Sequence, residues 1–396
     1  MHLTSDDIRF IQKHLNDDTN KLILAASKFP NLDIPFLADQ ILARKQIKSK
    51  LPYWYGEESL IFPSRIAAEQ CSSESTAEYK QRLVKGKVVC DLTGGLGVDS
   101  YYLSKQTVKS YYIERFENYC DAARNNFAVL GANHIEVLQG DSREILPSLD
   151  AIDTIYVDPA RRSDVNKRLF ALEDCEPNIL AMKESLLTKA KRLIIKISPM
   201  ADVRLTMELL PETTEVHVIS VKNECKELLF VLDAEKVKDD PVQLFCINFN
   251  TSGEEESFSF TRAQENDANP AYATGIKSYL YEPNASVLKA GAFKRIATHF
   301  GIEKLQINSH LYTSDELIMD FPGRIFKTEE TFDFASKNIK KLNKSIPKAN
   351  ITVRNFPLSV EDIRKKTGIK EGGEIYLFAT TLGKDLKVLV KGSKCK

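Results

Sequence analysis

The residues best suited to chemistry are acids placed around a glycine-rich turn. The segment Asp91-Leu-Thr-Gly-Gly-Leu-Gly-Val-Asp99 follows a short apolar run that predicts a strand. Glycines at such a turn allow a tight bend and let a ligand approach the backbone closely. A simple strand-to-helix turn uses the same glycines, so Gly94, Gly95 and Gly97 become candidate binding residues only together with the acids near them.

Two more acids follow the next two predicted strands. Glu114 ends the second strand, and Asp141 follows Gly140 after the third. An acid at the position of Glu114 is suited to accept hydrogen bonds from two ribose hydroxyls, and Asp141 is placed for an adenine amino group. Asp91 would attract a sulfonium with its ammonium group and repel a pyrophosphate. The acids therefore favour S-adenosylmethionine (SAM) over a dinucleotide.

Two nucleotide-binding motifs with glycine-rich turns fit less well. A dinucleotide fingerprint that starts at Gly95 needs a third glycine at position 100, where the sequence has Ser100. A phosphate-binding loop needs Gly-Lys followed by Ser or Thr, which this turn does not contain.

Alternating strands and helices must position these acids. Seven apolar runs predict strands at 87–90, 111–113, 135–138, 154–157, 193–197, 216–221 and 228–232. The alternation predicts a parallel sheet covered on both faces, with ligand sites at the carboxyl ends of the strands. The gap 222–227 is too short for a crossover helix, so the seventh strand is expected to be antiparallel to the sixth.

This set of residues resembles the class I SAM-dependent methyltransferases over roughly residues 85–235. The resemblance implies a Rossmann-like, seven-stranded α/β core. It also implies a SAM site made of Asp91, Gly94, Gly95, Gly97, Glu114 and Asp141, with Thr93, Asp99, Arg115 and Ser142 as neighbours.

The fourth predicted strand ends in Asp158-Pro-Ala-Arg-Arg162, beside the methyl group in this fold. Amino-group methyltransferases place an Asp, Asn or Ser, then two prolines and an aromatic residue here. Asp158 and Pro159 fit as catalytic residues, whereas Ala160 and Arg161 depart from the pattern and the aromatic clamp is lost. Asp158 would orient the acceptor and take up its proton. Arg161 and Arg162 would stack on a base or hold a phosphate; alternatively, Asp158 caps the turn and both arginines pair with surface acids.

Other polar residues near the strand ends leave alternatives open. Lys196 and Ser198-Pro199 would line the pocket or serve as core and cap residues. Cys225 in the sixth-to-seventh turn would allow covalent attack on a pyrimidine, but a plain polar loop fits better. His134 and His217 fit structural roles better than catalytic ones.

A longer resemblance is to bacterial methyltransferases with a C-terminal THUMP-like domain. It rests on the segments 69–77, 91–99, 158–162, 281–285 and 377–383. That family implies a small ferredoxin-like unit at about 280–330. The core is also similar to trimethylguanosine synthases, which methylate a guanine amino group. True THUMP domains bind RNA, so this resemblance implies structured RNA as the partner.

Four segments are expected along the 396 residues. They are a helical N-terminal region at 1–84, the methyltransferase core at 85–235, a linker hairpin with the ferredoxin-like unit at 236–330, and a basic THUMP-like domain at 331–396. Thr4 with Asp7 predicts the first helix start. The runs 242–249 and 257–260 predict a hairpin, and 286–300 predicts one helix that ends at Gly301.

Charge and cysteine usage narrow the class of protein. The net charge is zero, but residues 337–396 hold 15 Lys and Arg against 5 Asp and Glu, which leaves 40 against 50 elsewhere. Such a basic face suits a phosphate backbone or simply a solubilising surface. There is no signal-peptide pattern and no membrane-length apolar run. Seven scattered cysteines without metal-ligand spacing predict a cytoplasmic protein with no metal site.

The sequence therefore predicts a cytoplasmic SAM-dependent methyltransferase that acts on structured RNA, with an exocyclic amino nitrogen as the favoured acceptor. Two alternatives remain. One is a small-molecule methyltransferase whose C-terminal units only close the active site. The other is an inactive RNA-binding protein.

Overall fold

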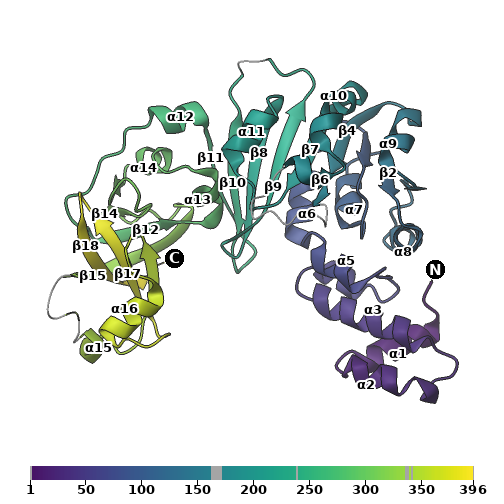
Figure 1. The fold of residues 1–396 in the computed structure, drawn as a ribbon, viewed down its shortest axis with the longest axis horizontal. Coiled ribbons are helices and arrows are strands. Elements are labelled where there is room, and N and C mark those ends of the chain that lie inside the picture. Colours follow the sequence, from purple (N-terminus) through teal and green to yellow (C-terminus); the bar gives the residue numbers. More distant parts are fainter. Residues whose placement is uncertain (1, 162–171, 238–239, 335–338, 340–341, 396) are drawn as a thin grey trace. The chain divides into compact units, whose positions relative to one another are not determined.

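The computed structural model describes residues 2–161, 172–237, 240–334, 339 and 342–395. They form two compact units. The first comprises Met1–Thr214 and Leu229–Lys238, and the second comprises Glu215–Leu228 and Asp239–Lys396. Figure 1 labels most elements of both units. Within the described part of the chain, no helix combines the length and the apolar character needed to cross a membrane.

Short helices form the N-terminal part of the first unit: α1 (Ser5–His14), α2 (Thr19–Leu24), η1 (Ala26–Lys28), α3 (Ile34–Ile47), α4 (Pro52–Gly56), α5 (Arg65–Gln70) and α6 (Glu74–Gln81). Thr4 and Asp7 form the predicted capping box at the start of α1. The fully buried Trp54 of α4 packs in one core with Tyr101 and Phe127. Helices α3 to α6 therefore share a hydrophobic core with the domain that follows, whereas α1 and α2 pack with α3 in a separate core.

A parallel sheet forms the rest of the first unit, with strand order β3-β2-β1-β4-β7. These strands are β1 (Val88–Asp91), β2 (Lys109–Glu114), β3 (Ile135–Gln139), β4 (Ile152–Val157) and β7 (Ala190–Ile197), and each neighbouring pair is parallel. Its helices are α7 (Val98–Ser104), α8 (Glu117–Val129), α9 (Ser142–Ile145), η2 (Leu146–Ser148), η3 (Leu172–Asp174), α10 (Ile179–Lys189) and α11 (Val203–Leu209); β5 (Ala160–Arg161) and β6 (Cys175–Glu176) form a small separate pair. The predicted Rossmann-like α/β architecture is confirmed.

The predicted reversal of the last core strand is also present. Strands β8 (Thr213–Val221) and β9 (Glu224–Asp233) are joined only by Lys222 and Asn223, which both have positive φ. Two such residues make a tight hairpin turn, so β9 runs antiparallel to β8. The expected hairpin follows as β10 (Gln243–Phe249) and β11 (Glu255–Thr261), and β10 pairs in parallel with β8.

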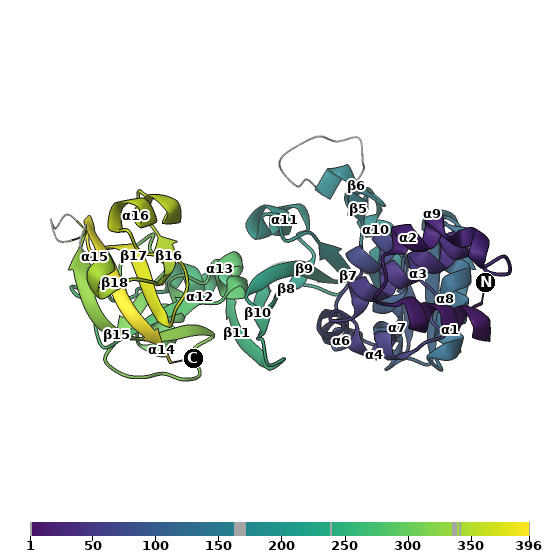
Figure 2. The same ribbon diagram turned by 90° about the horizontal axis from the view of Figure 1, so that it is seen from below.

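A seven-stranded sheet of order β13-β14-β12-β15-β18-β17-β16 dominates the second unit. The strands of this sheet are β12 (Tyr279–Pro283), β13 (Glu303–Lys304), β14 (Tyr312–Ser314), β15 (Gly323–Asp333), β16 (Asn350–Arg354), β17 (Ile375–Leu382) and β18 (Leu386–Lys394). The helices of the second unit are α12 (Arg262–Asp267), α13 (Ala285–Ala290), α14 (Arg295–Phe300), α15 (Leu342–Ser345) and α16 (Val360–Thr367). Figure 2 shows α16 lying beside β16 and β17.

The prediction of one continuous helix over 286–300 is wrong. The segment forms two helices, α13 and α14, because Gly291 adopts φ +79° and caps α13. The predicted end at Gly301, which has φ +65°, is confirmed.

Candidate active site

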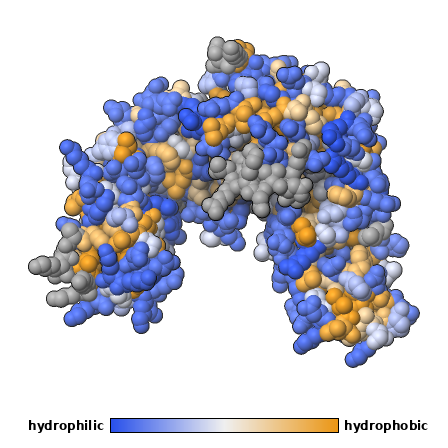
Figure 3. All heavy atoms as spheres, viewed as in Figure 1, coloured by the Kyte–Doolittle hydropathy of each residue, from blue (hydrophilic) through white to orange (hydrophobic). Residues whose placement is uncertain are grey.

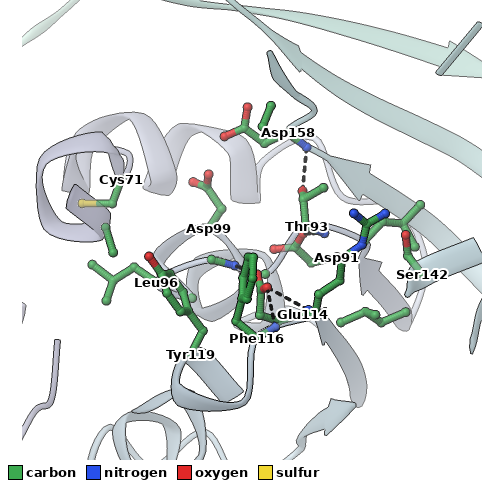
Figure 4. Close-up of a pocket in the computed structure, with 18 of the residues that line it drawn as sticks. Cys71, Asp91, Thr93, Leu96, Asp99, Glu114, Phe116, Tyr119, Ser142 and Asp158 are labelled. Carbon is green, nitrogen blue, oxygen red and sulfur yellow. Dashed lines mark hydrogen bonds between the residues drawn. The ribbon is translucent and has the colours of Figure 1, made fainter. Parts of the chain in front are cut away.

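A cavity of about 370 Å³ opens in the first unit where the strands β1, β2, β4 and β7 end. Its size is that of a small-molecule site. Figure 4 shows four acids around it: Asp91, Asp99, Glu114 and Asp158. The cavity also brings together these other predicted site residues: Thr93, Gly94, Gly95, Gly97, Arg115 and Ser142.

Close packing explains the glycine-rich turn. A Cβ atom at Gly94 would lie 2.3 Å from the ring of Tyr112, and one at Gly97, where φ is +85°, would lie 2.9 Å from the ring of Phe127. The hydroxyl of Tyr112 donates a hydrogen bond to the carbonyl oxygen of Gly95 at 2.6 Å. The turn is therefore packed against Tyr112 of β2 and Phe127 of α8, and its glycines line the cavity.

Glu114 joins this turn to the end of β2. Its carboxylate accepts hydrogen bonds from the backbone N–H groups of Gly95 at 3.0 Å, Arg115 at 2.7 Å and Phe116 at 3.0 Å, as Figure 4 shows. The side chain of Phe116 lines the same cavity, although this residue is 63% exposed. An exposed aromatic ring beside an acid is suited to cover a flat ligand ring. Phe116 was not among the predicted site residues, although it directly follows Glu114 and Arg115 in the sequence.

Asp91 is the buried acid of the site. It accepts hydrogen bonds from the hydroxyl of Ser100 and, at 2.9 Å, from the backbone N–H of Thr93. Burial raises the pKa of Asp91 to about 7, and the nearby Asp99 and Asp158 carboxylates act in the same direction. Near neutral pH this carboxyl is therefore poised to become an anion as a cation approaches.

Asp99 is held by groups from the N-terminal region and from the strands β4 and β7. The ammonium of Lys80 lies 3.1 Å from its Oδ1, and the hydroxyls of Ser72 and Tyr156 each donate to its Oδ2 at 2.8 Å. Burial alone would raise the pKa of Asp99, but the ammonium groups of Lys80 and Lys196 and these hydrogen bonds lower it to about 2. Ser72 and Lys80 were not among the predicted site residues, although Ser72 lies in the family segment 69–77.

Asp158 lies at the other side of the cavity, next to Lys196. The Lys196 Nζ is 2.6 Å from the Asp158 Oδ2, while 40% of the Asp158 side chain is exposed. The backbone N–H of Asp158 donates to the Thr93 hydroxyl at 2.8 Å, which ties β4 to the glycine-rich turn. Pro159 is buried and Ala160 lines the cavity.

Of the two arginines predicted to bind substrate, the structure describes only Arg161. Arg161 is the second residue of β5, where its backbone pairs with Cys175. Arg162 lies outside the described residues.

The carboxylate of Asp141 is bound by two arginines, Arg115 and Arg143. It accepts hydrogen bonds from Arg115 at 3.0 Å, from the Arg143 guanidinium at 2.6 and 3.0 Å, and from the Arg143 backbone at 2.9 Å. The hydrogen bonds from Arg143, together with the charge of Arg115, hold the pKa of Asp141 well below its usual range. Its neighbours Gly140 and Ser142 line the cavity, whereas Asp141 is not among the lining residues.

Other candidates fit structural roles. Burial raises the pKa of the Cys225 thiol to about 11, which disfavours the thiolate that covalent attack needs. His134 contacts the carbonyl oxygen of Ser104 at 3.0 Å, and His217 stacks on Phe245. Among the described residues, no three His, Cys, Asp or Glu side chains come together as a metal site.

Comparison with known proteins links both units to one kind of enzyme. Residues 279–322 match a family model described as a ferredoxin-like domain, and residues 323–392 match a THUMP domain-like model. A crystal structure from Porphyromonas gingivalis W83, assigned as that of a methyltransferase, is 36% identical over 100% of both chains, with a TM-score of 0.90. An uncharacterized S-adenosylmethionine-dependent methyltransferase of Mycobacterium tuberculosis H37Rv is 21% identical over 88% of this chain and 93% of its own length.

Proposed function

We propose a substrate for this chain, which belongs to the class I SAM-dependent methyltransferases that carry a C-terminal THUMP-like domain. The proposed reaction is methylation of an exocyclic amino nitrogen of a base in structured RNA. SAM is its cofactor. The observation that carries the acceptor proposal is the carboxylate of Asp158, which is partly exposed at the cavity and follows the strand β4.

The lining residues fit SAM. When bound, this cofactor supplies an electrophilic methyl group on a positively charged sulfur. Glu114 would accept hydrogen bonds from the ribose hydroxyls, Phe116 would cover one face of the adenine, and Asp91 would face the cationic end. The predicted contact between Asp141 and the adenine amino group requires one of its four hydrogen bonds to arginine to be exchanged, because a carboxylate offers about four acceptor positions.

Asp158 would act on the acceptor in two stages. Its carboxylate accepts a hydrogen bond from the acceptor amino group, which aligns the nitrogen lone pair with the methyl carbon. SAM, held by the residues that line the cavity, would supply the methyl group, and the electrons of the broken C–S bond would stay with sulfur. The nitrogen is then cationic, and its proton passes to Asp158 or to solvent.

The second unit carries the features that support RNA as the binding partner. Seven lysines of its C-terminal part are exposed: Lys344, Lys348, Lys365, Lys366, Lys370, Lys384 and Lys394. Lys348 and Lys370 are neighbours through a parallel β-bridge. Hydrophilic side chains also predominate on the face of the second unit that Figure 3 draws. Together with the THUMP-like match, this surface supports a phosphate-rich partner.

We expect the double variant Lys348→Gln, Lys370→Gln to bind structured RNA at least about fivefold more weakly at ~0.1 M salt. The slope of log K against log salt concentration should fall by about 1 to 2, because two fewer counterions are released. Fluorescence anisotropy at several salt concentrations measures both. The exposed pair Lys21 and Lys28 of the first unit, changed to Gln in the same way, is the matched control. Equal losses in both double variants would contradict a basic RNA-binding surface on the second unit.

SAM affinity should depend on pH through Asp91. Its pKa is about 7 in the free protein, and a bound cation would favour the ionised form and lower that pKa. Binding then releases a proton, so the affinity rises about tenfold between pH 6 and 8 and levels off above. Calorimetry in two buffers with different ionisation enthalpies measures the released proton. Asp91→Asn should abolish this dependence; a dependence that persists in the variant would assign it to another group.

The direct test of the acceptor uses labelled SAM, the full-length protein and total cellular RNA separated by size. A labelled nucleoside methylated on an exocyclic nitrogen supports the proposal. Label confined to a small-molecule fraction of a cell extract would instead support the small-molecule alternative. Absence of label from every fraction, with SAM bound, would favour the inactive RNA-binding protein.

A further inference from the structure

Strand register brings a lysine beside the acceptor-side acid. The parallel strands β4 and β7 pair Val157 with Ile195. The residues that follow them, Asp158 and Lys196, therefore lie next to each other at the same edge of the sheet. Their side chains meet at 2.6 Å at the cavity.

The lysine is held from its other side as well. Its Nζ lies 3.3 Å from the Ser72 hydroxyl and 3.8 Å from the Asp99 Oδ2. The Ser72 hydroxyl also accepts a hydrogen bond from the buried Lys80 at 2.9 Å and donates to Asp99 at 2.8 Å. Lys80, Asp99, Lys196 and Asp158 thus form a chain of alternating charges. It runs from the N-terminal helices to the edge of the cavity.

We propose that Lys196 is a positioning residue for methyl transfer, which binds one oxygen of Asp158 and so directs the carboxylate toward the acceptor. The inference rests on the proposed role of Asp158. Only 14% of the Lys196 side chain is exposed, against 40% for Asp158. The lysine is thus the enclosed partner and the acid is the one that opens onto the cavity.

This arrangement differs from an ordinary surface ion pair. An exposed pair contributes little because both long side chains remain free to move. Here Ser72 and Asp99 limit the positions of the Lys196 ammonium. The Asp158 carboxylate that binds this ammonium is therefore restricted in its orientation as well. A misplacement of about 1 Å in such a group lowers rates by about a hundredfold.

The test compares Lys196→Met, which keeps the length but removes the charge, with Lys196→Arg, which keeps a donor for Asp158. Lys196→Met should lower kcat by about 10- to 100-fold while the Kd for SAM changes less than about threefold. Lys196→Arg should recover at least about a fifth of the wild-type kcat. Lys183→Met is the matched control, because Lys183 forms a remote pair with Glu212 at 2.7 Å and is 15% exposed. It should leave kcat within about twofold.

Crystal structures of the two Lys196 variants add a readout that needs no acceptor. We expect the Asp158 carboxylate to rotate in Lys196→Met and to keep its orientation in Lys196→Arg. An unchanged Asp158 in Lys196→Met, or equal kcat losses in both variants, would overturn the positioning role. If the wild-type enzyme labels no RNA, the proposed acceptor fails, and the orientation of Asp158 still decides the role of Lys196.

Discussion

Replacing Asp158 with alanine should lower kcat for methyl transfer by about a thousandfold and leave the Kd for SAM within about threefold. Removal of the carboxylate takes away both the hydrogen bond that aligns the acceptor and the group placed to receive its proton, and such groups contribute about 10²- to 10⁴-fold. The effect falls on kcat because the cofactor contacts come from other residues of the cavity, Glu114 among them. Single-turnover transfer of a labelled methyl group and calorimetry of SAM binding measure the two quantities.

Two further variants make this result specific. Asp158→Asn keeps an oxygen that accepts a hydrogen bond but loses the charge, so its kcat should lie between those of the wild type and Asp158→Ala. Asp150→Ala removes an exposed acid at the opposite end of β4 and should leave kcat unchanged. A turn-capping role for Asp158 would instead give a lower melting temperature and weaker SAM binding in both Asp158 variants.

The central strands of the core could be predicted because their burial is nearly continuous. In β4, five of six residues are buried, and such an apolar run is typical of a parallel strand covered on both faces. The break between α13 and α14 was harder to see. Apolar residues continue through 286–300, but the helix ends at Gly291, whose backbone is left-handed, and helical structure resumes only at Arg295. A single glycine within an apolar helical pattern is often tolerated, so the pattern alone favoured one helix.

The acids of the site were predictable for a geometric reason. Parallel strands end at the same edge of the sheet, so acids at the ends of β1, β2 and β4 had to approach one another. Ser72 and Lys80 precede β1, and they reach Asp99 only because α6 packs against α7. Contacts of that kind depend on tertiary packing, which no local pattern records. The Lys196 contact was closer to being predictable, since it follows from the register of β4 and β7.

The partners of the acids divide them into two groups. Asp99 and Asp158 contact lysines, and Asp141 contacts arginines. Asp91 and Glu114 instead accept hydrogen bonds from hydroxyl and backbone N–H groups. Their negative charge is therefore balanced less by neighbouring cations. These two acids are the ones from which a cationic, hydroxyl-bearing cofactor should gain most.

Glu114→Ala should accordingly weaken SAM binding by at least about a hundredfold. Two hydrogen bonds from ribose hydroxyls to a carboxylate contribute about 1.5–3 kcal/mol each, and each 1.4 kcal/mol is a factor of ten in Kd. The variant also frees the backbone N–H of Gly95, which Glu114 holds at 3.0 Å, so the glycine-rich turn would lose part of its order. Calorimetric titration with SAM measures the change.

Matched variants separate the ribose contact from a general loss of charge. Glu117→Ala removes an exposed acid three residues away, in the first turn of α8, and should change the Kd for SAM less than about twofold. Glu114→Gln keeps one acceptor oxygen, so its Kd for SAM should lie between those of Glu117→Ala and Glu114→Ala. The amide oxygen can accept a hydrogen bond either from the turn or from one hydroxyl, and the amide carries no charge. A Kd for Glu114→Ala close to that of the wild type would mean that the ribose is held elsewhere. The acid at the end of β2 would then serve only to fix the turn.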